Sequence, residues 1–172
     1  MIRQAVASID LFAESLEDSM AQYVEPLFPL LKKVVSSNLG FDTIQIAISC
    51  YGSVAISMKE KMKPCFSEVI PLLVSIAELE VKGGNQAAVS EAMQSLGKMC
   101  VQCMDLQEFG HFIKPLVPKI YQRMVASQEP QIREASLAFF YNIAGCLKEA
   151  FGEYIHDLVP FTLRILEQNN EI

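Results

Sequence analysis

Four proline-containing segments recur along the chain and limit its fold more than any other feature. Each has an aromatic residue or a cysteine, then apolar residues, a proline and more apolar residues: YVEPLFPLL at 23–31, CFSEVIPLL at 65–73, FIKPLVPKI at 112–120 and YIHDLVPFT at 154–162. The second-half prolines follow at intervals of 42, 47 and 42 residues, at Pro29, Pro71, Pro118 and Pro160. A near-constant period of this length indicates a repeat protein, whose units bury their apolar faces against one another.

The residues between the prolines have the pattern of helices. Apolar side chains recur three and four positions apart, as on one helix face, at Ile9, Phe12, Ala13, Leu16 and Met20. Each proline segment is expected to open a second helix, at 24–36, 66–81, 113–126 and 155–168, because early helical amides lack an intrahelical acceptor. Turn signals at 38–40, 83–85 and 128–130 separate the units, and no strand-like alternation of useful length occurs.

Two antiparallel helices in each of four units predict an all-α fold, an α-solenoid of about four HEAT repeats wound as a right-handed superhelix. We expect a single array over 1–172, with repeats at approximately 1–38, 39–82, 83–127 and 128–172. The segment EPQIREA at 129–135 resembles the acidic-Pro-x-x-aliphatic-Arg opening of a HEAT repeat's first helix. The period is too long for a tetratricopeptide repeat.

The composition excludes several function classes. With 14 Lys+Arg against 20 Asp+Glu the formal net charge is −6, which argues against nucleic acid and is compatible with basic partners. The longest uncharged stretch, 43–58, has 16 residues and several polar ones, so no membrane insertion is expected. Five cysteines without a leader segment favour a reducing compartment.

No residue pattern in the chain predicts catalysis. Cys100 and Cys103 form a C-x-x-C, but the second half of a zinc site is missing, so we expect core cysteines and no metal. His111 and His156 lie in no catalytic motif and are expected to be solvated turn residues. The lysines at 59, 61 and 63 are expected in a solvated loop between helices. We therefore expect no enzyme and no cofactor.

A polar stripe on the second helices is the candidate binding site. When the units are aligned on their prolines, the positions three residues before, four after and seven after the proline lie on one helix face, which is largely polar. We expect the second helices to line the concave surface, so this stripe predicts a wall that binds a partner; a merely solvated face is the alternative. The candidate residues are Glu68, Ser75, Glu78, Gln122, Asp157, Arg164 and Glu167.

Several segments together point to a known family. They are LFAESL at 11–16, YVEPL at 23–27, QSLG at 94–97 and the last unit, where QIREASLAFF at 131–140 leads to FGEYI at 151–155. On these residues the chain resembles a stretch of an importin-beta (karyopherin-beta) family nuclear transport receptor, nearest the branch of importins four and five. Members of this family have many more repeats than four, so the resemblance implies a central piece of a longer receptor.

The resemblance implies a function in nuclear import. Such a receptor binds basic cargo proteins or their Lys/Arg-rich import-signal peptides on its concave face, and it works in the cytoplasm and the nucleus. The full-length receptor would also bind the GTPase Ran through amino-terminal repeats that this chain lacks, with nucleoporins as further partners. The alternative is a HEAT-repeat scaffold that organises a multiprotein complex such as a phosphatase.

Both ends of the predicted array are apolar. Val6, Ile9 and Phe12 belong to the first helix, and the last helix carries Leu158, Phe161 and Ile165. Terminal repeats of a solenoid need polar outer faces to stay apart. We therefore expect copies of this chain to associate end to end.

Overall fold

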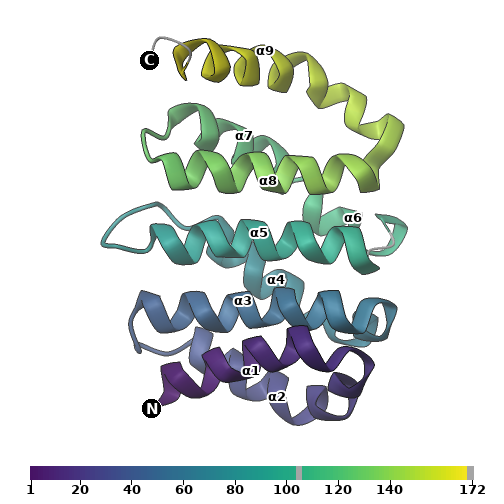
Figure 1. Cartoon of the computed structure of the whole chain (residues 1–172). Helices are drawn as coiled ribbons and strands as arrows, with labels where there is room; N and C mark the ends of the chain where they lie inside the picture. Colours follow the sequence, from purple (N-terminus) through teal and green to yellow (C-terminus); the bar gives the residue numbers. More distant parts are fainter. Residues whose placement is uncertain (104–105, 170–172) are drawn as a thin grey trace.

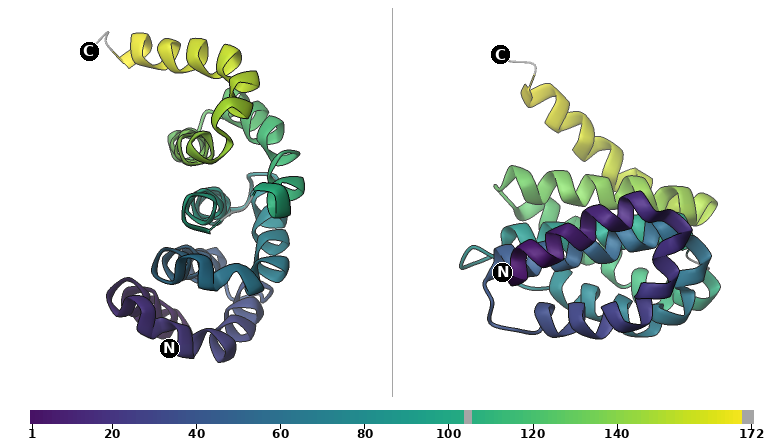
Figure 2. Two further views of the ribbon diagram at one scale, coloured as in Figure 1. Left: turned by 90° about the vertical axis from the view of Figure 1, so that its right-hand side faces the viewer. Right: turned by 60° about the horizontal axis from the view of Figure 1, so that its bottom comes forward.

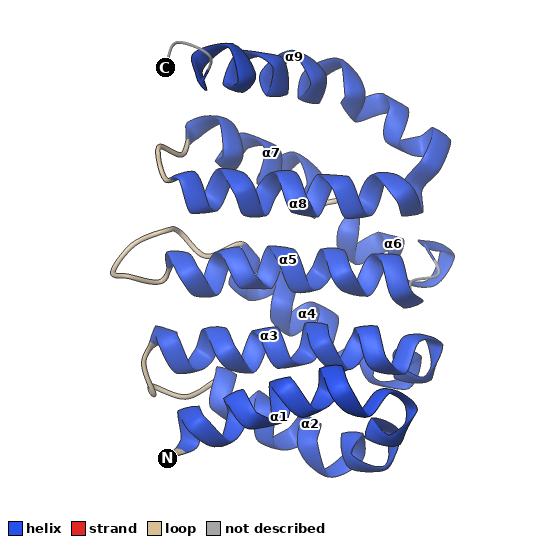
Figure 3. Cartoon of the chain, in the orientation of Figure 1, coloured by secondary structure: helices blue, strands red, loops and turns tan. Residues whose placement is uncertain are grey.

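The computed structural model describes the backbone of residues 1–103 and 106–169, and their side chains except those at 14, 17, 18, 60, 103, 106–109, 150, 166, 168 and 169. The described residues form helices joined by loops and turns, with no strand among them, as Figure 3 shows. The α-helices are α1 (Ile2–Leu16), α2 (Ala21–Val35), α3 (Phe41–Met58), α4 (Phe66–Ala77), α5 (Gln86–Cys103), α6 (Leu106–Ile113), α7 (Leu116–Ala126), α8 (Pro130–Leu147) and α9 (Gly152–Asn169). Short 3-10 segments follow three of them: η1 (Glu17–Met20), η2 (Lys59–Cys65) and η3 (Lys148–Phe151).

The helices form two stacked layers. Figure 1 shows α1, α3, α5 and α8 one above the other, with α2, α4, α6 and α7 behind them. In the first layer α1 packs on α3, α3 on α5 and α5 on α8. The prediction of an all-α helical-repeat fold is thus confirmed, whereas the HEAT class and the right-handed superhelix stay predictions.

The stack is bowed, and Figure 2 shows which layer lies inside the bow. In its left panel α1, α3, α5 and α8 lie toward the centre of curvature, and the second helices form the outer side. The direct packing between successive first-layer helices agrees, because a bow brings the inner elements of a stack together. The expectation that the second helices line the concave surface is therefore wrong. We call α1, α3, α5 and α8 the inner helices, and α2, α4, α6 and α7 the outer helices.

The packing partners differ from the pairs that the sequence order suggests. Three of the outer helices pack mainly on the inner helix that follows them in the chain: α2 on α3, α4 on α5 and α7 on α8. The fourth, α6, contacts its outer neighbours α4 and α7. The glycine-containing turn at Gly40, where φ is 85°, reverses the chain between α2 and α3. The packing unit is consequently shifted by one helix relative to the predicted segments 1–38, 39–82, 83–127 and 128–172.

The recurrent prolines lie inside the predicted second helices. Pro29, Pro71 and Pro160 are interior residues of α2, α4 and α9. Each removes one backbone hydrogen bond, and the carbonyl four residues earlier needs another partner. Pro29 and Pro160 are exposed, so water can hydrate that carbonyl. The third predicted helix, 113–126, is divided between α6 and α7, and Pro115 is the residue before α7.

The core lies between the two layers and between successive inner helices. Its largest fully buried side chains include Tyr51, Phe66 and Phe139. Small residues of α3, such as Cys50 and Ser53, are buried as well. None of the helices within the described residues combines the length and the apolar character that a bilayer crossing requires.

Candidate functional site

The seven predicted site residues are all exposed, but none of them lies on an inner helix. Glu68, Ser75 and Glu78 belong to α4 or its C-terminal cap, Gln122 lies on α7, and the other three lie on α9: Asp157, Arg164 and Glu167. The spacing of seven and three residues does place them on one face of each helix. They do not gather into one site, because they are spread over α4 with its cap, α7 and α9.

Two of the predicted acids are already paired with lysines of neighbouring outer helices. Glu68 Oε2 accepts a hydrogen bond from Lys32 Nζ of α2 at 3.2 Å. Glu78 Oε1 accepts one from Lys119 Nζ of α7 at 2.6 Å. These ion pairs connect α4 to the helices on either side of it, so the two carboxylates act first as links within the outer layer.

The inner helices carry a second cluster of polar side chains, which the sequence analysis did not identify. We define the inner patch as the half-buried side chains Asp10 of α1, Gln45 and Ser49 of α3, and Glu91 and Lys98 of α5. Burial raises the pKa of the Glu91 carboxyl, and the nearby charge of Asp10 adds to that rise. The Lys98 charge and the side chains of Gln45 and Ser49 act in the opposite direction.

Asp10 is the least satisfied member of the inner patch. Its Oδ1 atom is buried and has no hydrogen-bond partner among the described residues. Asp10 also contributes to the high pKa of the neighbouring Cys50 thiol, which burial raises to about 12. A buried carboxylate oxygen without a donor carries a desolvation cost, so this position favours an external cation or N–H donor.

The other residues singled out in the sequence lie on several different elements. Cys100 is buried in α5, and the side chain of Cys103 lies outside the described residues. His111 and His156 are exposed as predicted, although they lie in helices rather than turns. Lys59 belongs to η2, between α3 and α4, together with the lysines at 61 and 63. Among the described residues, no group of three or more His, Cys, Asp or Glu side chains could hold a metal ion.

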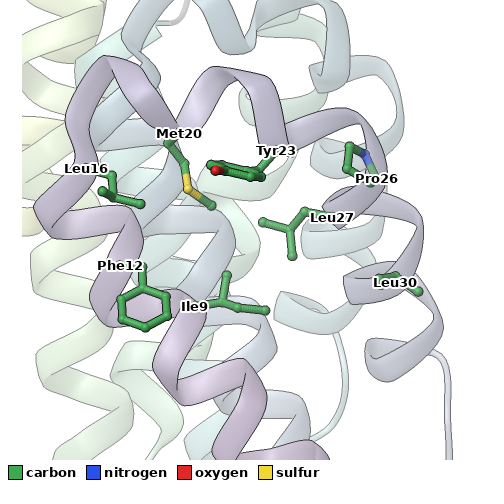
Figure 4. Close-up of a pocket in the computed structure, with 8 residues that line it drawn as sticks. All are labelled: Ile9, Phe12, Leu16, Met20, Tyr23, Pro26, Leu27 and Leu30. Atoms are coloured by element: carbon green, nitrogen blue, oxygen red, sulfur yellow. The ribbon is translucent and has the colours of Figure 1, made fainter.

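One end of the stack bears an apolar groove between α1 and α2. Figure 4 shows the side chains of both helices converging on this groove, which has a volume of about 390 Å³. Phe12 and Tyr23 are 56% and 50% exposed, so these two aromatic rings are largely open to solvent. The lining residues are Ile9, Phe12, Leu16, Met20, Tyr23, Pro26, Leu27 and Leu30.

Comparisons with known proteins do not assign this chain to a family. No protein-family model matches this chain, and no curated protein is significantly similar to it.

Proposed function

We propose that this chain is a protein-binding part of a nuclear import receptor and that its inner face captures Lys/Arg-rich segments of cargo proteins. The observation that carries the proposal is the placement of Asp10 and Glu91 in one patch across three adjacent inner helices. The segments that resemble importin-beta receptors support the nuclear import setting, in which the receptor works in both cytoplasm and nucleus. The whole receptor would also bind Ran and nucleoporins.

The electrostatics of the inner patch favour a bound cation. Lys98 offsets only one of the two negative charges of Asp10 and Glu91. A lysine or arginine side chain close to the two carboxylates would offset their mutual repulsion. The Gln45 and Ser49 side chains interact with the Glu91 carboxyl, and their oxygens can accept further N–H groups.

Several such contacts must act together to hold a cargo segment. An exposed ion pair contributes only about 0.2–1 kcal/mol, and a partly buried one contributes more. The net charge of −6 adds long-range attraction for a basic segment, which salt weakens. The outer acids Glu68 and Glu78 suit this role less well, because each is engaged by a lysine of the chain itself.

The test is a titration of a fluorescein-labelled Lys/Arg-rich peptide against the wild type and two charge-matched variants. Glu91→Gln combined with Asp10→Asn should weaken binding by about tenfold or more, since it removes both inner carboxylates. Glu68→Gln combined with Glu78→Gln removes the same charge from the outer layer and should change the affinity less than threefold. Equal losses in both variants would assign the binding to net charge alone and would remove the inner patch from the proposal.

A further inference from the structure

The chain has two equivalent clefts. One lies between two outer helices, and the other lies between an outer helix and α9. The first separates α2 from α4 and has a volume of about 200 Å³. The second separates α7 from α9 and has a volume of about 300 Å³. An inner helix forms the floor of each cleft, with Tyr51 of α3 in the first and Phe140 of α8 in the second.

The two clefts correspond residue by residue. Pro29 and Pro118 are 89 residues apart, and the same offset relates every residue that lines the second cleft to one that lines the first. It carries Tyr51 to Phe140, Val69 to Leu158, Lys32 to Tyr121 and Glu68 to Asp157, and all of these residues line their respective clefts. The chain therefore builds the same cleft twice, and the residues at its mouth differ.

In the first cleft the chain itself supplies a cation. The Lys32 side chain lies along the cleft and its Nζ atom donates to Glu68 Oε2 at 3.2 Å. In the second cleft the lysine is replaced by Tyr121, whose hydroxyl donates to the backbone oxygen of Asp157 at 3.4 Å and not to its carboxylate. Within the described part of the chain, no lysine, arginine or histidine forms an ion pair with Asp157.

The second cleft has the chemistry of a site for an organic cation. Tyr121, Tyr154 and Phe140 contribute aromatic rings, and Glu153 and Asp157 contribute carboxylates. A cation close to an aromatic face is attracted by the negative charge of the ring's face, and the carboxylates add ion pairing. The aliphatic stem of a lysine fits against the apolar wall that Val117 and Leu158 provide.

We propose that the cleft between α7 and α9 takes a lysine side chain from a bound basic segment, in the place that Lys32 occupies in the first cleft. This proposal rests on the proposed function, because it presupposes that basic segments bind. It also explains why Asp157 differs from Glu68 among the predicted site residues: Glu68 has an internal partner and Asp157 accepts an external one. The intermediate position of the outer layer has Val74 and Pro115 at the corresponding places, which carry no charge.

The decisive variant is Tyr121→Lys, which reproduces the arrangement of the first cleft. The new lysine should pair with Asp157 and exclude the ligand, so we expect Lys/Arg-rich peptide to bind about threefold to tenfold more weakly. Asp157→Asn is a conservative second variant and should cause a similar loss without changing the fold. Glu68→Gln removes an equivalent but internally paired acid and should leave the affinity unchanged.

A second readout reports on the cleft directly. In protein with ¹³C-labelled tyrosine rings, titration with the lysine peptide should shift the Tyr121 and Tyr154 ring signals of the wild type, and Asp157→Asn should abolish the shift. If peptide binds but neither cleft variant changes the affinity or the ring signals, the cleft proposal fails and the inner-face function stands. If the cleft variants respond and Glu91→Gln does not, the cleft proposal stands without the inner patch. If the wild type binds no peptide, both fail.

Discussion

Gly52 of α3 packs directly against Ser95 of α5: a β-carbon built on Gly52 would lie 2.9 Å from the Ser95 hydroxyl oxygen. Ser95 is fully buried, and its hydroxyl donates to the Ile48 carbonyl oxygen at 3.1 Å, so it has little room to move. The next interface repeats this device, with Gly97 of α5 against Asn142 of α8 at 2.8 Å. Glycine at these two positions sets the close spacing of the inner helices.

Replacing Gly52 by a larger residue should push α3 and α5 apart. We expect Gly52→Val to destabilise the fold by about 1–3 kcal/mol, because the added atoms overpack the buried Ser95 contact. The control is Gly145→Ala in α8, where an added β-carbon meets nothing within 4 Å and helix propensity predicts a gain of about 0.5–1 kcal/mol. Urea unfolding followed by circular dichroism measures both, and an unchanged midpoint for Gly52→Val would refute the packing account.

Two lysines hold a backbone conformation that glycine prefers. Lys59 and Lys148 follow α3 and α8 with φ values of 50° and 49°, and the repeat offset of 89 residues relates them. Because a β-carbon strains this conformation, Lys59→Gly should raise the free energy of unfolding by about 1 kcal/mol. Lys59→Ala keeps the β-carbon and serves as the control. A gain from alanine equal to that from glycine would show that charge, and not backbone strain, is responsible.

The ends of the stack should associate. The groove between α1 and α2 exposes Phe12 and Tyr23, and α9 exposes Ile155, Val159 and Leu163, whereas Leu158 and Phe161 are buried. An unlike pair of apolar ends permits head-to-tail contact between copies. Light scattering on a size-exclusion column should give a mass that rises with concentration, and Phe12→Glu should suppress the rise. A wild type that stays monomeric at high concentration would contradict the expectation.

The pH dependence of the free energy of unfolding should show that the ionised Glu91 carboxylate lowers stability, as expected of a residue that serves binding. Burial holds its pKa above the ordinary value of 4.5, so the folded state retains the proton longer than the unfolded state. Stability is therefore lost as the pH rises from 4.5 through the raised pKa, and the penalty is complete above it. Glu91→Gln should match the wild type in acid and exceed it at neutral pH. A variant that is less stable at neutral pH would give the carboxylate a structural role.

The sequence predicts the succession of helices, but it does not predict which neighbouring helices pack together. The recurrent prolines and the three-and-four spacing predict alternating helices, and the structure has them. The glycine at position 40 correctly marks a turn, which we interpreted as a boundary between repeats. In the folded chain this turn joins two helices that pack together. A linear pattern of alternating helices does not state which of its two neighbours a helix packs on.

The predicted position of the candidate site depended on which layer of helices lies on the concave side, and the linear pattern does not state this either. The stripe that includes Glu68 and Glu78 is polar and exposed as predicted, but it lies on the outer layer and both acids are paired within the chain. The inner patch joins Asp10 to Glu91 across α3, and no local spacing connects such distant positions. The available signal was polar side chains, such as Gln45, on otherwise apolar first helices.

The capture of basic segments is the central claim, and one titration tests it most directly. A fluorescein-labelled Lys/Arg-rich peptide and its Lys→Glu counterpart are titrated with the wild-type chain by fluorescence anisotropy, at low and at physiological salt. We predict binding of the basic peptide alone, with an affinity that falls as the salt concentration rises. Absence of binding at low salt, or equal binding of the two peptides, would contradict the account.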